Sequence, residues 1–159
     1  MKNKGFSLIE LMVVIAIIAI VTMIAAPNLT RFLAKAKRSE AYANLNAIYT
    51  HQKIYQAEHG RYSDALSGPN GIGWKPEGYK GGGQGENFYY TYGFAHGAEG
   101  VNYYTGNLSA SHSDLSRAYA DERGFVVVAA GDIDADGKPD ILTVDETSTI
   151  RIVEDDLAD

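Results

Sequence analysis

The sequence predicts an α+β fold, in which a long N-terminal helix packs on a small antiparallel β-sheet head. Residues 6–26 are mostly apolar and carry no charge except Glu10, and helix-compatible sequence continues to about residue 58. After that, short aromatic and β-branched segments alternate with glycine-rich turns, a pattern typical of paired strands. Since 159 residues leave room for one ordinary domain and one long element, residues 59–159 are predicted to form a single head.

The apolar segment has the length of a membrane-spanning helix, which needs about 20 residues. Lys2 and Lys4 precede it and give the chain a basic start. A secretory signal peptide would have a shorter apolar region, of about 7 to 15 residues, and a small-x-small cleavage site. The segment therefore predicts a transmembrane helix, and the simplest interpretation is an uncleaved anchor.

Glu10 argues against a plain anchor. A carboxylate in the middle of a bilayer costs on the order of 2.5 kcal/mol or more, and an anchor gains nothing from it. Because Glu10 lies near one end of the apolar segment, snorkelling toward the headgroups would reduce this cost, so a tolerated charge is the alternative.

Residues 1–21, MKNKGFSLIELMVVIAIIAIV, resemble the leader and first helix of type IV pilins and related pseudopilins, and the likeness extends to about residue 30. The resemblance implies that a prepilin peptidase removes residues 1–5, cutting between Gly5 and Phe6, and N-methylates Phe6. It also implies that Glu10 of one subunit neutralises the new amino group of Phe6 in a neighbouring subunit. Two buried charges that need each other act as a register device for assembly more than as a source of stability.

Pro27 is expected to kink the helix, because proline removes a backbone hydrogen bond and clashes with the preceding turn. The alternative is a boundary between two helices. Beyond Pro27 the apolar residues fall on one side, at 3- and 4-residue spacing, which predicts packing against the head. A basic cluster follows the apolar segment, and we interpret it as a solvated face or as a contact with acidic loops of adjacent subunits or lipid headgroups. Its members are Arg31, Lys35, Lys37 and Arg38.

In the head, residues 88–94 (FYYTYGF) alternate in the manner of a half-buried strand, and residues 101–105 (VNYYT) are expected to pair with them. The chain has 11 tyrosines, and at strand positions such residues are expected in the core or in an interface. Since the chain has no cysteine, no disulfide can fasten the head.

The sharpest chemical motif is GDIDADGKPD, at residues 131–140 between two strand-like segments. It resembles the first nine positions of an EF-hand calcium loop, with carboxylates at alternate positions, a glycine for the turn, and a backbone carbonyl at the seventh position. The expected ligands are Asp132, Asp134, Asp136, the carbonyl of Lys138, and Asp140. Thr143 stands where an EF-hand has its bidentate Glu, so Asp145 or Glu146 is expected to complete a structural Ca²⁺ site. The alternative is an Asp- and Gly-rich hairpin turn.

The sequence predicts a structural subunit of a type IV pilus, inserted in the inner membrane and then assembled into an extracellular helical homopolymer by dedicated machinery. Adhesion, motility and DNA uptake stay open as its roles. The first alternative is the major pseudopilin of a type II secretion system, in a periplasmic pseudopilus, and the second is a membrane-anchored binding module. No catalytic constellation appears in the sequence, so we predict that the protein is not an enzyme. The net charge of −6, with the acids concentrated after residue 120, argues against sequence-specific nucleic-acid binding.

Overall fold

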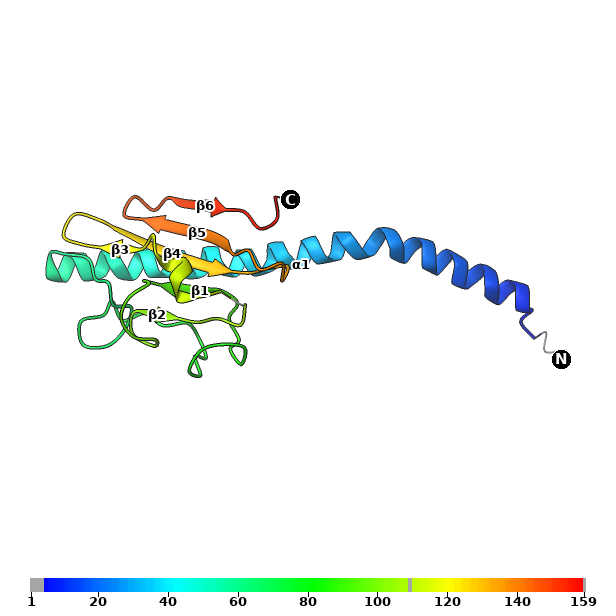
Figure 1. Cartoon of the computed structure of the whole chain (residues 1–159), viewed down its shortest axis with the longest axis horizontal. Coiled ribbons are helices and arrows are strands. Elements are labelled where there is room, and N and C mark those ends of the chain that lie inside the picture. The colour runs from blue at the N-terminus through cyan, green and yellow to red at the C-terminus, as the bar shows by residue number, and fades with distance from the viewer. Residues whose placement is uncertain (1–4, 109, 159) are drawn as a thin grey trace. The chain divides into compact units, whose positions relative to one another are not determined.

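The computed structural model describes residues 5–108 and 110–158, and for residues 26–28 and 30 it describes only the helical backbone. One helix, α1, spans Leu8–His59 (Figure 1). It begins two residues later and ends one residue later than predicted. The alternative of two helices meeting at Pro27 is wrong, because α1 continues through that position. The predicted kink of the helix at Pro27 stays a prediction.

The helix ends where the sequence places a glycine. Gly60 has φ +74°, a conformation that L side chains rarely adopt. Its N–H donates to the carbonyl of Gln56 at 2.8 Å, which satisfies one of the last carbonyls of the helix.

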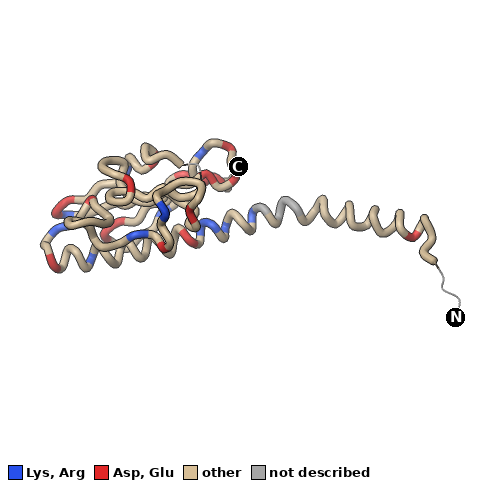
Figure 2. The backbone as a smooth tube through the Cα atoms, turned by 90° about the horizontal axis from the view of Figure 1, so that it is seen from below, with Lys and Arg blue, Asp and Glu red and all other residues tan. Residues whose placement is uncertain are grey.

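The chain divides into two compact units, one ending at Lys35 and the other running from Ala36 to Asp159. In the first, Leu8–Ala25 has a mean hydropathy of 2.9 and none of it is buried within the chain. It is the one helix among the described residues that is long and apolar enough to cross a membrane. Figure 2 shows this part of α1 mostly in tan, with acidic colouring near its start.

The second unit contains an antiparallel sheet ordered β2-β1-β4-β5-β6, with β3 paired to β4. Its elements are β1 (Thr91–Gly93), β2 (Tyr103–Tyr104), the 3-10 helix η1 (His112–Leu115), β3 (Tyr119–Ala120), β4 (Phe125–Gly131), β5 (Asp140–Asp145) and β6 (Ile150–Glu154). The α+β class and the antiparallel sheet are therefore confirmed. The expected pairing of residues 88–94 with 101–105 is confirmed over its central part, where Tyr92 faces Tyr104.

The sheet lies along the second half of α1, as Figure 1 shows. The fully buried residues of this half of the helix recur at intervals of three or four: Ala41, Leu45, Ile48 and Gln52. From the sheet side, Phe125 contacts the ring of Tyr49, with centroids 6.2 Å apart. This is the one-sided packing that the spacing predicts.

Three tyrosines of the head lie in its core, as expected, whereas Tyr119 of β3 is exposed. Tyr90, Tyr92 and Tyr104 are at most 1% exposed, and each buried hydroxyl has a partner. Tyr92 donates to Glu40 at 3.2 Å and accepts from Asn44 at 3.0 Å, which ties β1 to α1. These rings supply apolar bulk, while their hydroxyls bond to polar groups of α1, of β5 and of the loop before β2.

Candidate functional site

The first turn of α1 holds the predicted processing and assembly residues. Gly5 and Phe6 precede the helix and are exposed, and Phe6 is 84% exposed. Ser7 and Glu10 form a reciprocal pair: Ser7 N–H donates to Glu10 Oε2 at 2.8 Å, and Glu10 N–H donates to Ser7 Oγ at 3.3 Å. This is a capping box, which satisfies two of the free N–H groups at a helix start. The S-x-x-E spacing before an apolar run could have revealed it, but our sequence analysis missed it.

The surroundings of Glu10 are apolar. A shallow hollow of about 320 Å³ beside it is lined by Phe6, Ile9, Val13 and Val14. A charged group and an open apolar surface therefore lie together on the first two turns of α1. A second helix could cover this surface only if the charge were neutralised at the same time.

The acidic motif forms the connection from β4 to β5. Asp132, Asp134 and Asp136 each contribute an oxygen to a group whose atoms all lie within 4.8 Å of one another. Backbone N–H groups hold the carboxylates in place: Ala135 and Gly137 donate to the two oxygens of Asp132, at 2.7 and 3.0 Å. The turn requires φ +92° at Gly137, which the sequence supplies.

The fourth carboxylate of the group is Asp156, which sequence analysis did not identify. It lies in the tail after β6. Since β6 runs antiparallel to β5, this tail returns to the edge where β5 begins. The N–H of Ile133 donates to Asp156 Oδ2 at 2.9 Å. Burial, and then the charges of Asp134 and Asp136, raise the pKa of Asp156.

The predicted completing residues lie elsewhere. Asp145 is at the far end of β5, where its Oδ1 accepts the N–H groups of Thr147 and Thr149. Glu146 lies against Gly124, beside the turn from β3 to β4. Lys138 lies within the loop, and its N–H donates to Asp136 Oδ1 at 2.8 Å. Ligation by the Lys138 carbonyl stays a prediction.

Asp140, which we expected as a ligand, is not a member of this group. It is fully buried, and its two oxygens accept from Arg38, at 3.0 Å from Nε and 2.6 Å from Nη2, and from the Tyr90 hydroxyl at 2.7 Å. Arg38 also pairs with Asp155, in the same tail as Asp156. The alternating spacing could not distinguish a cation ligand from the partner of an arginine on a distant helix.

The basic cluster is therefore not simply a solvated face. Arg38 is 12% exposed, and the neighbouring Lys37 donates from Nζ to the carbonyl of Ile133 at 3.1 Å. Both side chains fasten α1 to the acidic end of the sheet. Burial is the largest influence on the pKa of Arg38 and opposes its charge, but the bonds to Asp140 and Asp155 outweigh it, so the pKa is raised.

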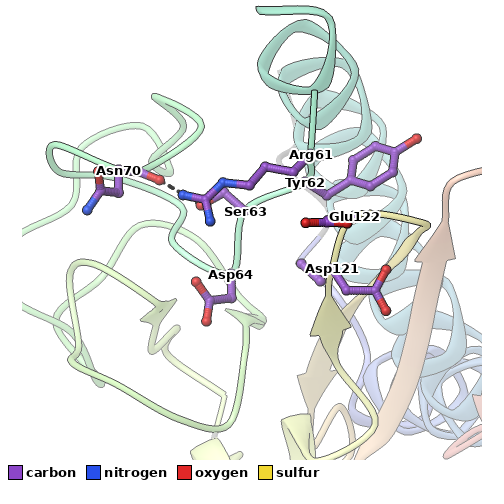
Figure 3. A pocket seen from close by; sticks show the side chains of 8 residues that line it. Arg61, Tyr62, Ser63, Asp64, Asn70, Asp121 and Glu122 are labelled. Atoms are coloured by element: carbon purple, nitrogen blue, oxygen red, sulfur yellow. Dashed lines mark hydrogen bonds between the residues drawn. The ribbon is translucent and has the colours of Figure 1, made fainter. Parts of the chain in front are cut away.

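A separate polar cleft of about 340 Å³ lies between the end of α1 and the turn from β3 to β4 (Figure 3). Most of its polar groups serve the local fold. Ser63 Oγ donates to the carbonyl of Asn70 at 2.7 Å, and Asp121 Oδ1 accepts the N–H groups of Arg123 and Gly124 at 2.6 and 2.9 Å. We assign no chemistry to this cleft.

These features define a class of protein: an α+β head on a helix whose apolar half carries a single acidic residue, Glu10, in its first turn. The model of the prokaryotic N-terminal methylation motif matches residues 1–26. The chain is 53% identical over 76 residues to the type IV major pilin protein PilA of Myxococcus xanthus, covering 48% of this chain and 33% of that protein. It is 38% identical to the type IV wide pilus major component PilA4 of Thermus thermophilus, over 47% of this chain and 58% of that one.

A third relative is the type II secretion system core protein G of Dickeya chrysanthemi, at 29% identity over 47% of this chain and 49% of the relative. The matches span less than two thirds of the length of each of these relatives. The methylation motif and these similarities support the assignment of the chain to the type IV pilin and pseudopilin family, a family of structural proteins.

Proposed function

We propose that this protein is the structural subunit of a type IV pilus. It is inserted in the inner membrane, cleaved between Gly5 and Phe6 by a prepilin peptidase, and polymerised through α1 into a helical filament by assembly machinery. The observation that carries the proposal is Glu10. It is the only charge in the fully exposed apolar half of α1, and it lies four residues after the first residue of the processed chain.

The geometry supports pairing between subunits. The capping bond from the Ser7 N–H uses Oε2 of Glu10, and Oε1 is not part of that bond. An amino group freed at Phe6 of a neighbour can donate to Oε1 without breaking the cap. Burial of the apolar hollow then removes water from both charges together, which makes the pair a condition for correct docking.

The test compares Glu10→Ala with Glu58→Ala, an exposed acidic residue in the last turn of α1, in cells that produce the chain. Wild-type and Glu58→Ala cells should form surface filaments under the electron microscope. Glu10→Ala should leave processed subunit in the membrane at normal level and reduce filament number by tenfold or more. Undiminished filaments in Glu10→Ala cells would refute the pairing.

The same experiment separates the competing functions. A membrane-anchored binding module would form no filament with any of the three chains. A pseudopilin would form no long surface fibres at normal expression, and its deletion would abolish secretion of an exported protein. The relatives include both pilins and secretion core proteins, so this comparison is needed.

We further propose that Asp132, Asp134, Asp136 and Asp156, with the carbonyl of Lys138, hold a structural Ca²⁺ ion. Calcium takes six to eight oxygen ligands at about 2.3 to 2.6 Å, and the mutual approach of the four carboxylates within 4.8 Å suits such an ion. A divalent cation would neutralise part of their repulsion and fasten the C-terminal tail to the β4–β5 loop. It would thus serve where the cysteine-free chain has no disulfide.

Calcium should raise the melting temperature of the full-length protein by several degrees, with an affinity of about 0.1 to 1 mM. Asp156→Asn should weaken the calcium affinity by about tenfold or more, equivalent to about 1.4 kcal/mol. Asp145→Asn is the matched control, because Asp145 lies at the far end of β5, and it should keep the calcium response. Identical melting curves of the wild type in calcium and in chelator would disprove the site.

A further inference from the structure

A second buried carboxylate lies in the glycine-rich segment at residues 79–87. This segment is far along the chain from the connection between β4 and β5 at residues 132–139, which we call the aspartate loop. Glu86 is 5% exposed, and its Oε1 accepts the N–H groups of Lys80 and Gly82, both at 2.8 Å. Gly81, Gly82 and Gly83 have φ values of +126°, +94° and +90°. Such a run is open only to glycine, and it lets the backbone wrap around the carboxylate.

The other oxygen of Glu86 has no partner. Oε2 is buried, and it is the one buried side-chain oxygen or nitrogen among the described residues that makes no hydrogen bond. The two backbone donors on Oε1 hold the carboxylate in place but do not reach Oε2. A charged oxygen in a buried position without a donor is costly, so a group that can neutralise it is expected at Oε2.

A second carboxylate approaches the same point of the loop. A Cβ atom on Gly82 would lie 1.8 Å from Oε1 of Glu99, so only glycine allows this approach. Glu86 therefore contacts Gly82 at its N–H, while Glu99 lies against its Cα. Both carboxylates also act on the phenol of Tyr79: its pKa is raised mainly by burial and further by the charges of Glu99 and Glu86.

The nearby ammonium group does not resolve this excess of negative charge. Lys80 Nζ donates to the carbonyl of Gly85 at 3.0 Å and to Asn87 Oδ1 at 3.1 Å. Among the described residues, no ion pair involves Glu86 or Glu99. Two carboxylates, one of them buried with an unpaired oxygen, thus lie against Gly82 without an ion-pair partner among the described residues. Glu99 Oε1 accepts the N–H of Thr105 at 3.3 Å.

We propose that Glu86 and Glu99, with the hydroxyl of Tyr79, bind a hard divalent cation such as Ca²⁺ at a site distinct from the aspartate loop. Carboxylate and hydroxyl oxygens are the ligands such cations prefer. The ion would give Glu86 Oε2 the partner that it lacks, and it would link the glycine-rich loop to Glu99, which precedes β2. The proposal does not depend on polymerisation.

The test uses Tb³⁺ as a calcium probe on the full-length protein in detergent, with emission sensitised by excitation of nearby aromatic rings. A double variant, Asp134→Asn with Asp156→Asn, removes two carboxylates of the aspartate loop. It should still bind one Tb³⁺ ion with sensitised emission, because Tyr79 lies at the second site, and added Ca²⁺ should compete. Adding Glu99→Gln to this background should weaken Tb³⁺ binding by tenfold or more.

Glu77→Gln is the matched control, because it neutralises another exposed acidic residue of the same region, and it should leave binding unchanged. The fluorescence of Trp74, the chain's single tryptophan, checks that each variant is folded. If Glu99→Gln fails this check, Glu99→Asp replaces it: a shorter side chain with the same charge should still weaken binding. Loss of all sensitised Tb³⁺ binding in the double variant would overturn the proposal. Equal binding by the folded Glu99 and Glu77 variants would do the same, since water alone would then satisfy Glu86.

Discussion

Arg38 shows how a single residue can hold the helix, the sheet and the tail together. Its guanidinium bonds to Asp140 at the start of β5 and to Asp155 after β6. Asp140 is fully buried, and it accepts hydrogen bonds from this arginine and from the Tyr90 hydroxyl. A planar guanidinium suits two carboxylates better than an ammonium does, because its donors form a rigid fork.

Arg38→Ala should destabilise the head by about 3 kcal/mol, because it leaves the Asp140 carboxylate buried and without its cation. Arg38→Lys should recover only part of the loss. The measurement is urea unfolding of the full-length protein in detergent, followed by Trp74 fluorescence. Arg117→Ala is the control: its pair with Glu154 is about half exposed on both sides and should contribute about 0.5 kcal/mol or less. Equal effects of Arg38→Ala and Arg117→Ala would show that the buried pair contributes little.

At the scale of elements, the antiparallel β5–β6 pair decides which residues meet. The pairing register of the two strands shifts between Ile141 and Leu142. Beyond the paired residues, β6 continues into the C-terminal tail. The tail brings Asp155 to Arg38 and Asp156 to the aspartate loop. Two acidic neighbours in sequence thus have opposite surroundings, one beside a cation and one among carboxylates.

The pKa of Asp155 is lowered, first by its bond to Arg38 and then by the N–H of Leu157. A carboxyl group with a lowered pKa in the folded state contributes stability above its unfolded value, here 3.8, and loses that contribution as the pH falls through the folded value. Hydrogen exchange at the Leu157 amide reports whether its N–H is bonded to the Asp155 carboxylate at a given pH. Above pH 4 the wild type should protect this amide better than Asp155→Asn does, and the difference should vanish at lower pH. A difference that persists at pH 2 would contradict the assignment.

The elements were predictable where local patterns determine them. The uninterrupted apolar run, the one-sided spacing from Leu45 to Tyr55 and the glycine at residue 60 predict α1, and the alternation at residues 88–94 predicts β1. The candidate cation group was only partly predictable. Asp132, Asp134 and Asp136 are close in sequence, whereas Asp156 joins them through the return of β6, which no local pattern records. Asp140 was misassigned for the same reason, because its partner lies 102 positions away on α1.

At the scale of the whole molecule, the chain divides between residues 35 and 36 into a unit made for an apolar environment and a unit with its own core. The second unit keeps the buried face of α1, the sheet, Arg38 and both carboxylate clusters. Among the described residues of the first unit, the large apolar side chains are exposed, including Ile15, Ile18 and Val21 at 58 to 59%. Such a surface requires lipid or other helices as its neighbours.

A truncated protein starting at Ala36 should therefore fold as a monomer in water, because the buried residues of α1 from Ala41 to Tyr55 are retained and, among the described residues, Ala34 is the one buried residue of the helix that is lost. We expect the melting temperature of the truncated protein to lie within a few degrees of that of the full-length protein in detergent, and its Trp74 emission to match. Analytical ultracentrifugation should find a single monomeric species. A truncated protein starting at Asn46 is the control: it loses Arg38, Ala41 and Leu45 and should unfold. Self-association of the Ala36 protein would show that the head carries an assembly surface of its own, and its unfolding would show that the head needs the apolar half of α1.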